Sequence, residues 1–212
     1  MRTGVSVAAL VLGLTNPLAS QGFLESFSYE GLGFSGIAMD AGVVVSDRLT
    51  RELSGSVRLD FGMFSPNVRV VFGLSGFRAQ LNADEINQFE ERLRILVPGA
   101  VTVNVGTIDW TDIELFADLQ YMISMSRDFN FYVGFGVGVH YQDGDGAAIN
   151  DTFVEDALDT ILAGINSSVG FEVRAIGPLY WTAEVRGGLT SELSFSSART
   201  GLLYRFYTPG TN

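Results

Sequence analysis

Phe129-Asn-Phe-Tyr-Val-Gly-Phe-Gly-Val-Gly-Val-His-Tyr141 is the stretch of sequence that decides the fold. Its odd positions are all apolar, whereas its even positions carry glycine or polar residues. Only an extended strand sends successive side chains to opposite faces with this period of two. A continuous apolar face, with an aromatic residue at each end and glycine opposite, is typical of a strand whose apolar face meets lipid.

The composition supports a membrane location without a membrane-spanning helix. Of the 212 residues, 47% are hydrophobic, yet the chain has no apolar run long enough for such a helix. The N-terminus has Arg2, an apolar run over residues 5–14 and small residues up to Ser20, which predicts a secretory signal peptide over residues 1–20. A short buried helix is the alternative. An exported apolar chain can enter a membrane by closing a β-sheet, because closure leaves no unpaired backbone in lipid.

The charge balance excludes one class of partner. The net charge is −11, with 13 basic residues against 24 acidic ones. Nucleic acid binding needs a basic surface, so we expect no nucleic acid partner. The chain contains no cysteine, which rules out disulfide bonds and decides little else.

The same alternation recurs and predicts eight strands between residues 35 and 207. Three connections are tight turns, around Pro66, Arg127 and Gly177. The connections at the opposite end are two short loops and two long ones, and each long loop has a capping box followed by apolar residues at helical spacing. Short turns at one end and long loops at the other are typical of outer-membrane barrels. The predicted segments are a lead-in (21–34), a transmembrane barrel (35–207) with helix-bearing outer loops (82–106 and 143–166), and a C-terminal tail (208–212).

These observations predict an all-β fold, an eight-stranded antiparallel up-and-down transmembrane β-barrel with short helices in two outer loops. The alternative is a water-soluble barrel such as a lipocalin, which would bury its apolar face and expose charge. In this sequence the charges of the strand centres fall opposite the continuous apolar face, which favours the membrane barrel.

The pattern resembles the small eight-stranded barrels of the OmpA-type and OmpW-type families, as a barrel alone without a periplasmic domain. The final strand, Arg199-Thr-Gly-Leu-Leu-Tyr-Arg-Phe206, is the most specific part of the resemblance. Its Tyr204 and Phe206 are similar to the signal read by the outer-membrane assembly machinery, although six residues follow Phe206. The resemblance implies localisation in the bacterial outer membrane, contact with outer-membrane lipid and lipopolysaccharide, and a monomer.

Strand parity assigns side chains to the two faces of the barrel. The predicted lipid-facing residues include Phe61, Phe72, Leu119, Phe131, Phe135, Phe171 and Trp181. We expect the inward charged residues to form an ion-pair network, because an unpaired charge in a narrow barrel is costly. Its predicted members are Asp40, Arg58, Asp60, Arg69, Glu114, Asp118, Glu172, Arg174, Glu184, Arg186, Arg199 and Arg205.

The single histidine, His140, is the residue that an enzyme hypothesis would need. Some eight-stranded outer-membrane barrels modify lipid A with a histidine, a serine and an acid at the barrel edge. His140 has no serine two residues on, and its parity points it into the lumen, so we expect a polar lumen residue and no catalytic residue. Asp143-Gly-Asp-Gly146 lacks the further ligands of a calcium loop, so no metal site and no cofactor are predicted.

The predicted function is therefore a non-enzymatic outer-membrane barrel with an envelope-structural or surface-binding role, its lumen plugged by the Arg/Asp/Glu network. A narrow porin-like channel for ions or small solutes is the alternative, and a lipid A-modifying enzyme is a weaker one.

Overall fold

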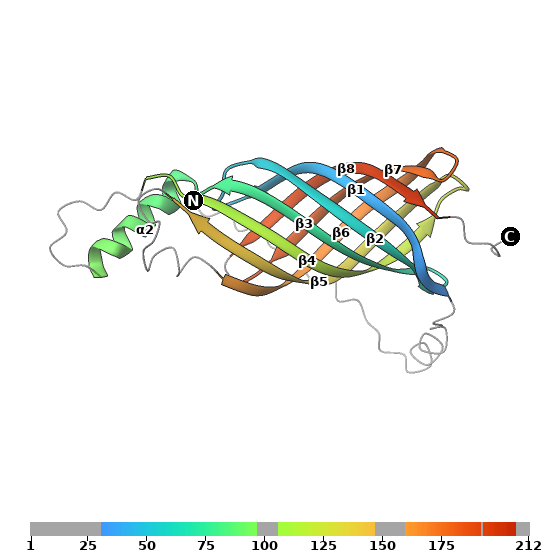
Figure 1. Ribbon diagram of the computed structural model, residues 1–212, viewed down its shortest axis with the longest axis horizontal. Helices are drawn as coiled ribbons and strands as arrows, with labels where there is room; N and C mark the ends of the chain where they lie inside the picture. The colour runs from blue at the N-terminus through green and yellow to red at the C-terminus, as the bar shows by residue number, and fades with distance from the viewer. Residues whose placement is uncertain (1–30, 97–105, 147–159, 192, 207–212) are drawn as a thin grey trace.

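The computed structural model is a closed barrel of eight antiparallel strands in the order β1 to β8, with β8 pairing back to β1 (Figure 1). It describes residues 31–96, 106–146, 160–191 and 193–206. The predicted fold class is confirmed in its strand number, its closure and its up-and-down topology. The strands are β1 (Leu32–Ser46), β2 (Glu52–Ser65), β3 (Val68–Gln80), β4 (Asp109–Ser124), β5 (Phe129–Asp145), β6 (Thr160–Ile176), β7 (Leu179–Leu189) and β8 (Ser194–Arg205).

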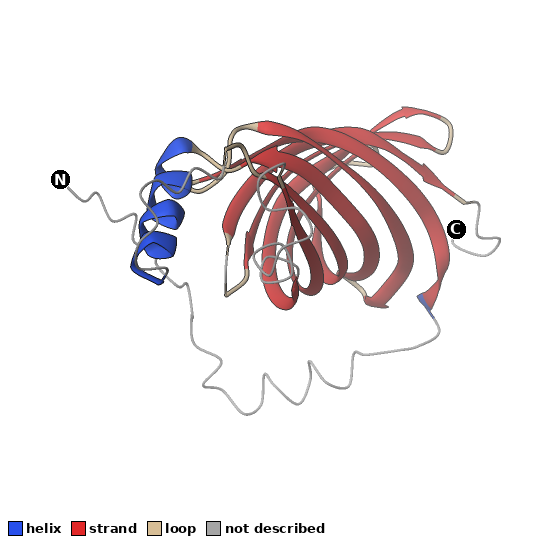
Figure 2. Cartoon of the chain, turned by 60° about the vertical axis from the view of Figure 1, so that its left-hand side comes forward, coloured by secondary structure: helices blue, strands red, loops and turns tan. Residues whose placement is uncertain are grey.

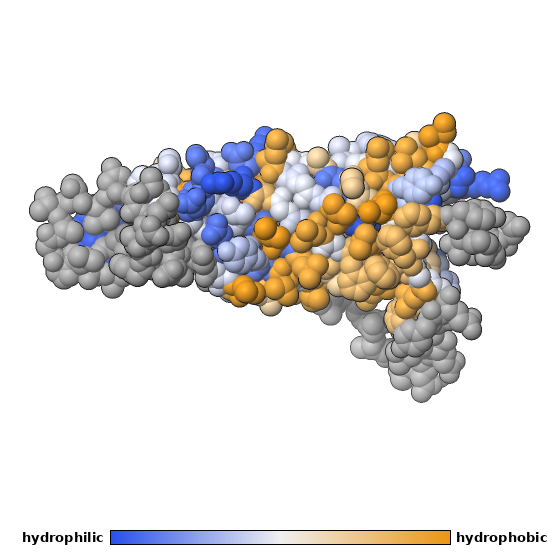
Figure 3. Space-filling model, viewed as in Figure 1, coloured by the Kyte–Doolittle hydropathy of each residue, from blue (hydrophilic) through white to orange (hydrophobic). Residues whose placement is uncertain are grey.

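The alternation of the sequence becomes an alternation of burial. Along β4, for example, Asp112 and Glu114 are buried, whereas Ile113 and Leu115 are exposed. Figure 3 shows hydrophobic residues spread over the outer surface of the barrel, most densely towards one end. Each strand therefore turns its polar face to the interior and its apolar face outward, the arrangement of a barrel immersed in lipid.

The two ends of the barrel differ. Three tight turns lie at the end where β1 begins and β8 stops, and we call this the inner end. The outer end carries the longer connections, including helix α2 (Ala83–Leu96), which extends beyond the strands (Figure 2). The side chain of Asn82 caps this helix, because its Oδ1 accepts a hydrogen bond of 2.9 Å from the backbone nitrogen of Glu85. No helix in the described part of the chain is long and apolar enough to cross a membrane.

The predicted loop boundaries need correction at the second long loop. β5 continues to Asp145 and β6 begins at Thr160, so the expected loop over 143–166 is shorter at both ends. Ile161, Leu162 and Ile165 lie within the loop that was predicted to carry a helix, and their spacing fits its apolar stripe. They belong instead to β6, where pairing with β5 satisfies their backbone groups. The rest of that predicted helix lies outside the described residues, as do the signal peptide, residues 207–212 and most of the lead-in, whose last residues join β1.

Apolar side chains cover both ends of the lumen. At the outer end Trp110 and Phe195 form a buried cluster that also contains Val44, Leu49, Ala79 and Leu193. At the inner end Ala38, Tyr180 and Leu203 form a smaller one. Between these clusters the interior is occupied by charged and polar side chains, which are the candidate functional site.

Candidate functional site: the charged lumen

The first group of lumen charges, which we call the balanced cluster, lies on six of the strands. Its members are Asp40 on β1, Arg58 and Asp60 on β2, Arg69 on β3, Glu172 on β6, Glu184 on β7, and Arg199 and Arg205 on β8. Most of these side chains are almost fully buried, and only Arg205 is appreciably exposed. They therefore depend on one another for the stabilisation that water would otherwise supply.

Arg58 is the centre of one half of the balanced cluster. Its Nε and Nη2 lie 2.8 and 2.9 Å from the two carboxylate oxygens of Asp40, a bidentate pair. Its Nη1 donates to Glu184 at 3.1 Å and also to the hydroxyl of Tyr132. The other oxygen of Glu184 accepts a bond of 2.6 Å from Arg199. One arginine thus connects β2 to β1, its neighbour, and to β7 on the other side of the barrel.

The other half of the balanced cluster centres on Glu172. This carboxylate lies 2.6 Å from Arg69 and 2.5 Å from Arg205. Arg69 also pairs with Asp60 at 3.1 Å, and its Nη2 donates to Gln120 at 2.5 Å. Strands β2, β3, β6 and β8 are thereby joined through their side chains as well as through backbone hydrogen bonds.

The second group, which we call the acidic cluster, comprises Asp112, Glu114, Asp118, His140 and Arg186. Arg186 lies 2.5 Å from Asp118 and 3.1 Å from Glu114, and its guanidinium stacks 3.9 Å above the ring of Phe116. His140 Nδ1 lies 3.0 Å from Asp112 Oδ1, while its Nε2 faces Glu114 Oε1 at 3.7 Å. Arg186 therefore joins β7 to β4, and His140 joins β5 to β4.

The bare glycine face of β5 makes room for this cluster. A β-carbon on Gly136 would overlap Asp118 Oδ1, and a β-carbon on Gly138 would lie 2.7 Å from Glu114 Oε1. The glycines of this stretch have no side chains, and the carboxylates of β4 extend into the room that is left.

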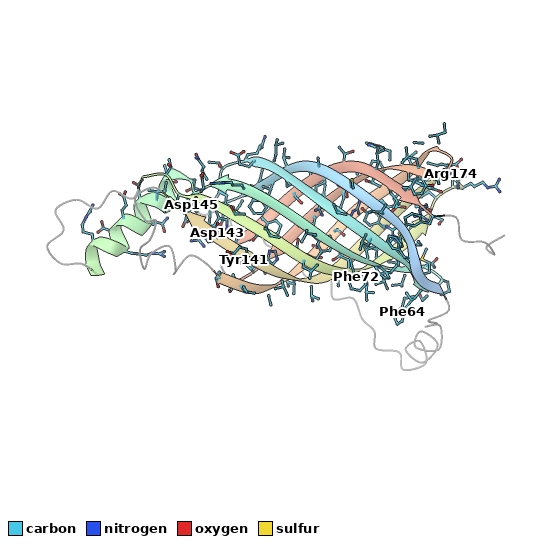
Figure 4. The ribbon with its side chains drawn as sticks, viewed as in Figure 1. Phe64, Phe72, Tyr141, Asp143, Asp145 and Arg174 are labelled. Carbon is cyan, nitrogen blue, oxygen red and sulfur yellow. The ribbon has the colours of Figure 1, made fainter. Side chains whose placement is uncertain are left out.

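The predicted lumen network and the observed one differ at two residues, Arg174 and Asp112. Arg174 was expected in the lumen but lies at the inner end, where its side chain is 43% exposed and 3.3 Å from Asp128 (Figure 4). It forms the last regular pair of β6 and β7, with Tyr180, so it lies at the rim of the barrel, where its side chain reaches solvent. Asp112 is absent from the predicted network, although it is buried in the lumen. It lies two residues before Glu114, a predicted member on the same strand, so strand parity alone would have indicated it.

The predicted lipid-facing residues lie on the outer surface. Leu119, Phe135, Phe72 and Trp181 are exposed, and Phe61, Phe131 and Phe171 are partly exposed. Several of these rings touch, with centroids 5.1 Å apart for Phe61 and Phe72 and 5.3 Å apart for Phe171 and Trp181. Tyr204 and Phe206 are also exposed and stack edge to face at 5.5 Å. The aromatic rings gather towards the inner end, as in the interfacial girdles of membrane barrels.

Two of the gaps between the described lumen side chains are small. Arg58, Asp60, Arg69 and Glu172 border a cavity of about 10 Å³, and a second cavity of about 10 Å³ lies between Ser54, Asp112, Glu114 and Arg186. Each has room for about one water molecule. The buried atoms without a protein partner, such as Ser54 Oγ and Gln142 Oε1, are the groups that ordered water would satisfy.

The geometry around His140 bears on the enzyme hypothesis. The imidazole is 1% exposed, lies inside the lumen and contacts Asp112, Glu114 and the ring of Phe195. A lipid substrate outside the barrel could not reach it without opening the strands. Within the described ranges, no group of three or more histidine or acidic side chains is arranged to hold a metal ion. Asp143 and Asp145, at the outer end in Figure 4, belong to β5.

Comparisons with known proteins agree on the fold. No family model matches the sequence, and no curated protein matches it. Among solved structures, Neisserial surface protein A (NspA) is 11% identical with a TM-score of 0.54, over 82% of this chain and 97% of that one. A major outer membrane protein from Thermus thermophilus is 9% identical with a TM-score of 0.50, over 81% of this chain and 99% of that one.

The closed topology, the apolar outer surface and the polar interior are thus found together with a measurable likeness to solved outer-membrane proteins. The chain has the fold of the small eight-stranded outer-membrane barrels, in agreement with the predicted localisation in the bacterial outer membrane.

Proposed function

We propose that this protein is a non-enzymatic barrel of the bacterial outer membrane, with a structural or surface-binding role in the envelope. In this proposal the charged side chains of the lumen close the barrel, so that no solute passes through it. The observation that supports it is a pair of buried ion-pair networks, one from Asp40 through Arg58 to Glu184 and one from Asp118 through Arg186 to Glu114, with two cavities of about 10 Å³ beside them. The same buried position of His140 argues against a lipid A-modifying activity.

Single-channel conductance of the refolded protein in a planar bilayer tests the closed lumen. We expect no conductance steps for the wild type, and steps for Arg186→Ala, because that substitution removes the cation between Asp118 and Glu114. Arg78→Ala is the matched control, since Arg78 is 60% exposed at the outer end and pairs with Asp109 outside the lumen. Reproducible wild-type steps that depend on salt and change in Arg186→Ala would overturn the closed lumen.

A narrow channel for ions or small solutes is the second candidate. It is favoured by the buried polar atoms that have no protein partner. They include atoms of Ser54, Gln142 and Arg205. Water molecules bound at these positions would form a continuous path through the lumen after small side-chain movements. The conductance experiment decides between the two candidates directly.

The proposed partners follow from the membrane location. Outer-membrane lipid and lipopolysaccharide would cover the exposed apolar surface, and the assembly machinery would recognise Tyr204 and Phe206. We propose a monomer, because β8 closes on β1 and leaves no open sheet edge in the barrel. Refolding yield in the presence of the purified assembly machinery, with and without Phe206→Ala, tests the recognition, and an unchanged yield would exclude Phe206 from it.

A further inference from the structure

The buried charges of the lumen do not balance evenly between the two clusters. In the described chain, the balanced cluster holds four carboxylates and four arginines. The acidic cluster holds Asp112, Glu114 and Asp118 against one arginine, Arg186, and one histidine, His140. If the three acids are ionised and the imidazole is neutral, this cluster carries two uncompensated negative charges. Buried charges without compensation are strongly unfavourable, so positive charge must be bound there.

An unpartnered amide oxygen shows where one positive charge is missing. Asn166 is 6% exposed, and its Nδ2 donates to Glu114 Oε1 at 3.3 Å, but its Oδ1 has no donor. This oxygen and Asp118 Oδ1 border the same space at Gly136, since a β-carbon on that glycine would overlap Asp118 Oδ1 and lie 2.8 Å from Asn166 Oδ1. Exchanging the oxygen and nitrogen of the amide would not supply a donor, because the amide oxygen would then lie against Glu114 Oε1, which is also an acceptor. Asp118 Oδ1 accepts a hydrogen bond of 3.4 Å from Arg186, but an ionised Asp118 has no hydrogen to donate to Asn166 Oδ1.

The second position lies at the imidazole. His140 Nδ1 is within hydrogen-bond distance of Asp112, and its Nε2 lies 3.7 Å from Glu114 Oε1, another acceptor, which is within ion-pair range but too far for a direct hydrogen bond. A neutral imidazole can donate from only one nitrogen, whereas an imidazolium donates from both. The surroundings of His140 therefore match its charged form.

We propose that the acidic cluster is a binding site for two protons, one on His140 and one shared between Asp118 and Asn166. The charged groups around the site are Asp112, Glu114 and Asp118 from β4, His140 from β5, Glu184 and Arg186 from β7, and Arg199 from β8. Bound protons neutralise the cluster without a metal ion, whose approach to Glu114 and Asp118 the positive charge of Arg186 would oppose. This site is independent of whether the lumen conducts.

The pH dependence of unfolding measures these protons. In the unfolded chain aspartate is ionised above about pH 5 and histidine is neutral above about pH 7.5. Each proton held by the native state alone raises the unfolding equilibrium constant about tenfold per pH unit, so the stability from these protons is lost as the pH rises. From about pH 7 to 9, we expect this constant to rise about tenfold more per pH unit for the wild type than for Asp118→Asn, as long as the native site keeps its protons.

Matched variants separate this effect from a general loss of stability. Asp118→Asn removes one excess charge and one proton, whereas Asp40→Asn removes a carboxylate that Arg58 needs. We expect Asp40→Asn to unfold more easily at every pH while keeping the wild-type slope. Equal slopes for the wild type and Asp118→Asn would overturn the proposal.

Two further measurements test for a bound metal cation and provide a readout if Asp118→Asn does not fold. Replacing choline by sodium at constant pH and ionic strength should leave stability unchanged, and stabilisation of the wild type by sodium would overturn the proposal by showing that a metal cation occupies the site. If Asp118→Asn does not fold, infrared spectroscopy of the wild type at neutral pH decides. The carbonyl stretching band of a protonated carboxylic acid is expected, and its absence would overturn the shared proton.

Discussion

Replacing Arg58 by methionine is the sharpest test of the balanced cluster. Arg58 is almost fully buried and pairs with both Asp40 and Glu184. Methionine has a similar length and fills the space without a charge, so little cavity energy is added. The substitution leaves four carboxylates facing three arginines among the described members of this cluster.

The expected loss of stability depends on which hydrogen-bond and ion-pair partners Asp40 and Glu184 keep after the substitution. Breaking a buried ion pair from one side typically costs about 3–5 kcal/mol. Glu184 keeps Arg199 at 2.6 Å, and Asp40 keeps the hydroxyl of Thr182 at 2.7 Å, so neither acid is left without a partner. We therefore expect a loss near the lower limit, about 3 kcal/mol in the free energy of unfolding.

Urea unfolding from lipid vesicles, followed by tryptophan fluorescence, measures this loss. The chain has two tryptophans, Trp110 inside the outer end of the lumen and Trp181 on the outer surface. With a urea dependence of about 1–3 kcal/mol per molar, the midpoint should fall by about 1–3 M. Arg78→Met is the control, because an exposed ion pair contributes less than about 1 kcal/mol.

A double variant isolates the ion pair itself. Adding Asp40→Asn to Arg58→Met removes the carboxylate that the first substitution left without its arginine, so part of the loss should be recovered, about 1–2 kcal/mol. A loss for Arg58→Met no larger than for Arg78→Met would refute the reasoning. So would a double variant whose loss is simply the sum of the two single losses.

Three other substitutions test separate parts of the structure. Leu119→Arg, which puts a charge at an exposed position of β4, should cost about 2–4 kcal/mol in the unfolding free energy measured from bilayers. Gly136→Ala should cost about 1–3 kcal/mol in the same assay, because its β-carbon would lie 2.5 Å from the backbone oxygen of Ala117, whereas Gly55→Ala meets nothing nearer than 3.9 Å and should be neutral. Asn82→Ala should destabilise the start of α2 by about 0.5–2 kcal/mol, seen as faster amide hydrogen exchange there.

The sequence predicted the strands well because lipid enforces a strict alternation. A residue on the outer face must be apolar, so the period of two persists over whole strands such as β5. The pattern was ambiguous in the second long loop, where apolar residues satisfied two periods at once. Ile161, Leu162 and Ile165 fit a helical stripe and a strand equally, and the backbone pairing of β6 with β5 decided between them.

The partners within the lumen could not be predicted from parity. Parity states that Arg58 and Glu184 share the interior, but they are 126 residues apart, and their contact depends on the stagger of all the strands between them. Local irregularities change parity as well. Near Gly62, which has a φ of 80°, a shift in the pairing of β2 with β3 sets Met63 opposite Arg69, an inward residue. Strict alternation from Phe61, a predicted lipid-facing residue, would instead place Met63 outside.

The lumen network also accounts for how this barrel selects one strand register. A slip of one residue turns the apolar face inward and is excluded by lipid, but a slip of two residues keeps every apolar side chain outside. Outer residues such as Val137 and Val139 would tolerate that slip, since lipid contacts are non-directional. The inner charges would not, because Arg58 reaches from β2 to β7 and Arg69 from β3 to β6, between strands that share no backbone bonds. A shift of two residues moves a charged group by about 7 Å and separates such pairs. The specificity of the fold therefore resides mainly in the lumen, and the apolar surface determines only that the barrel lies in a membrane.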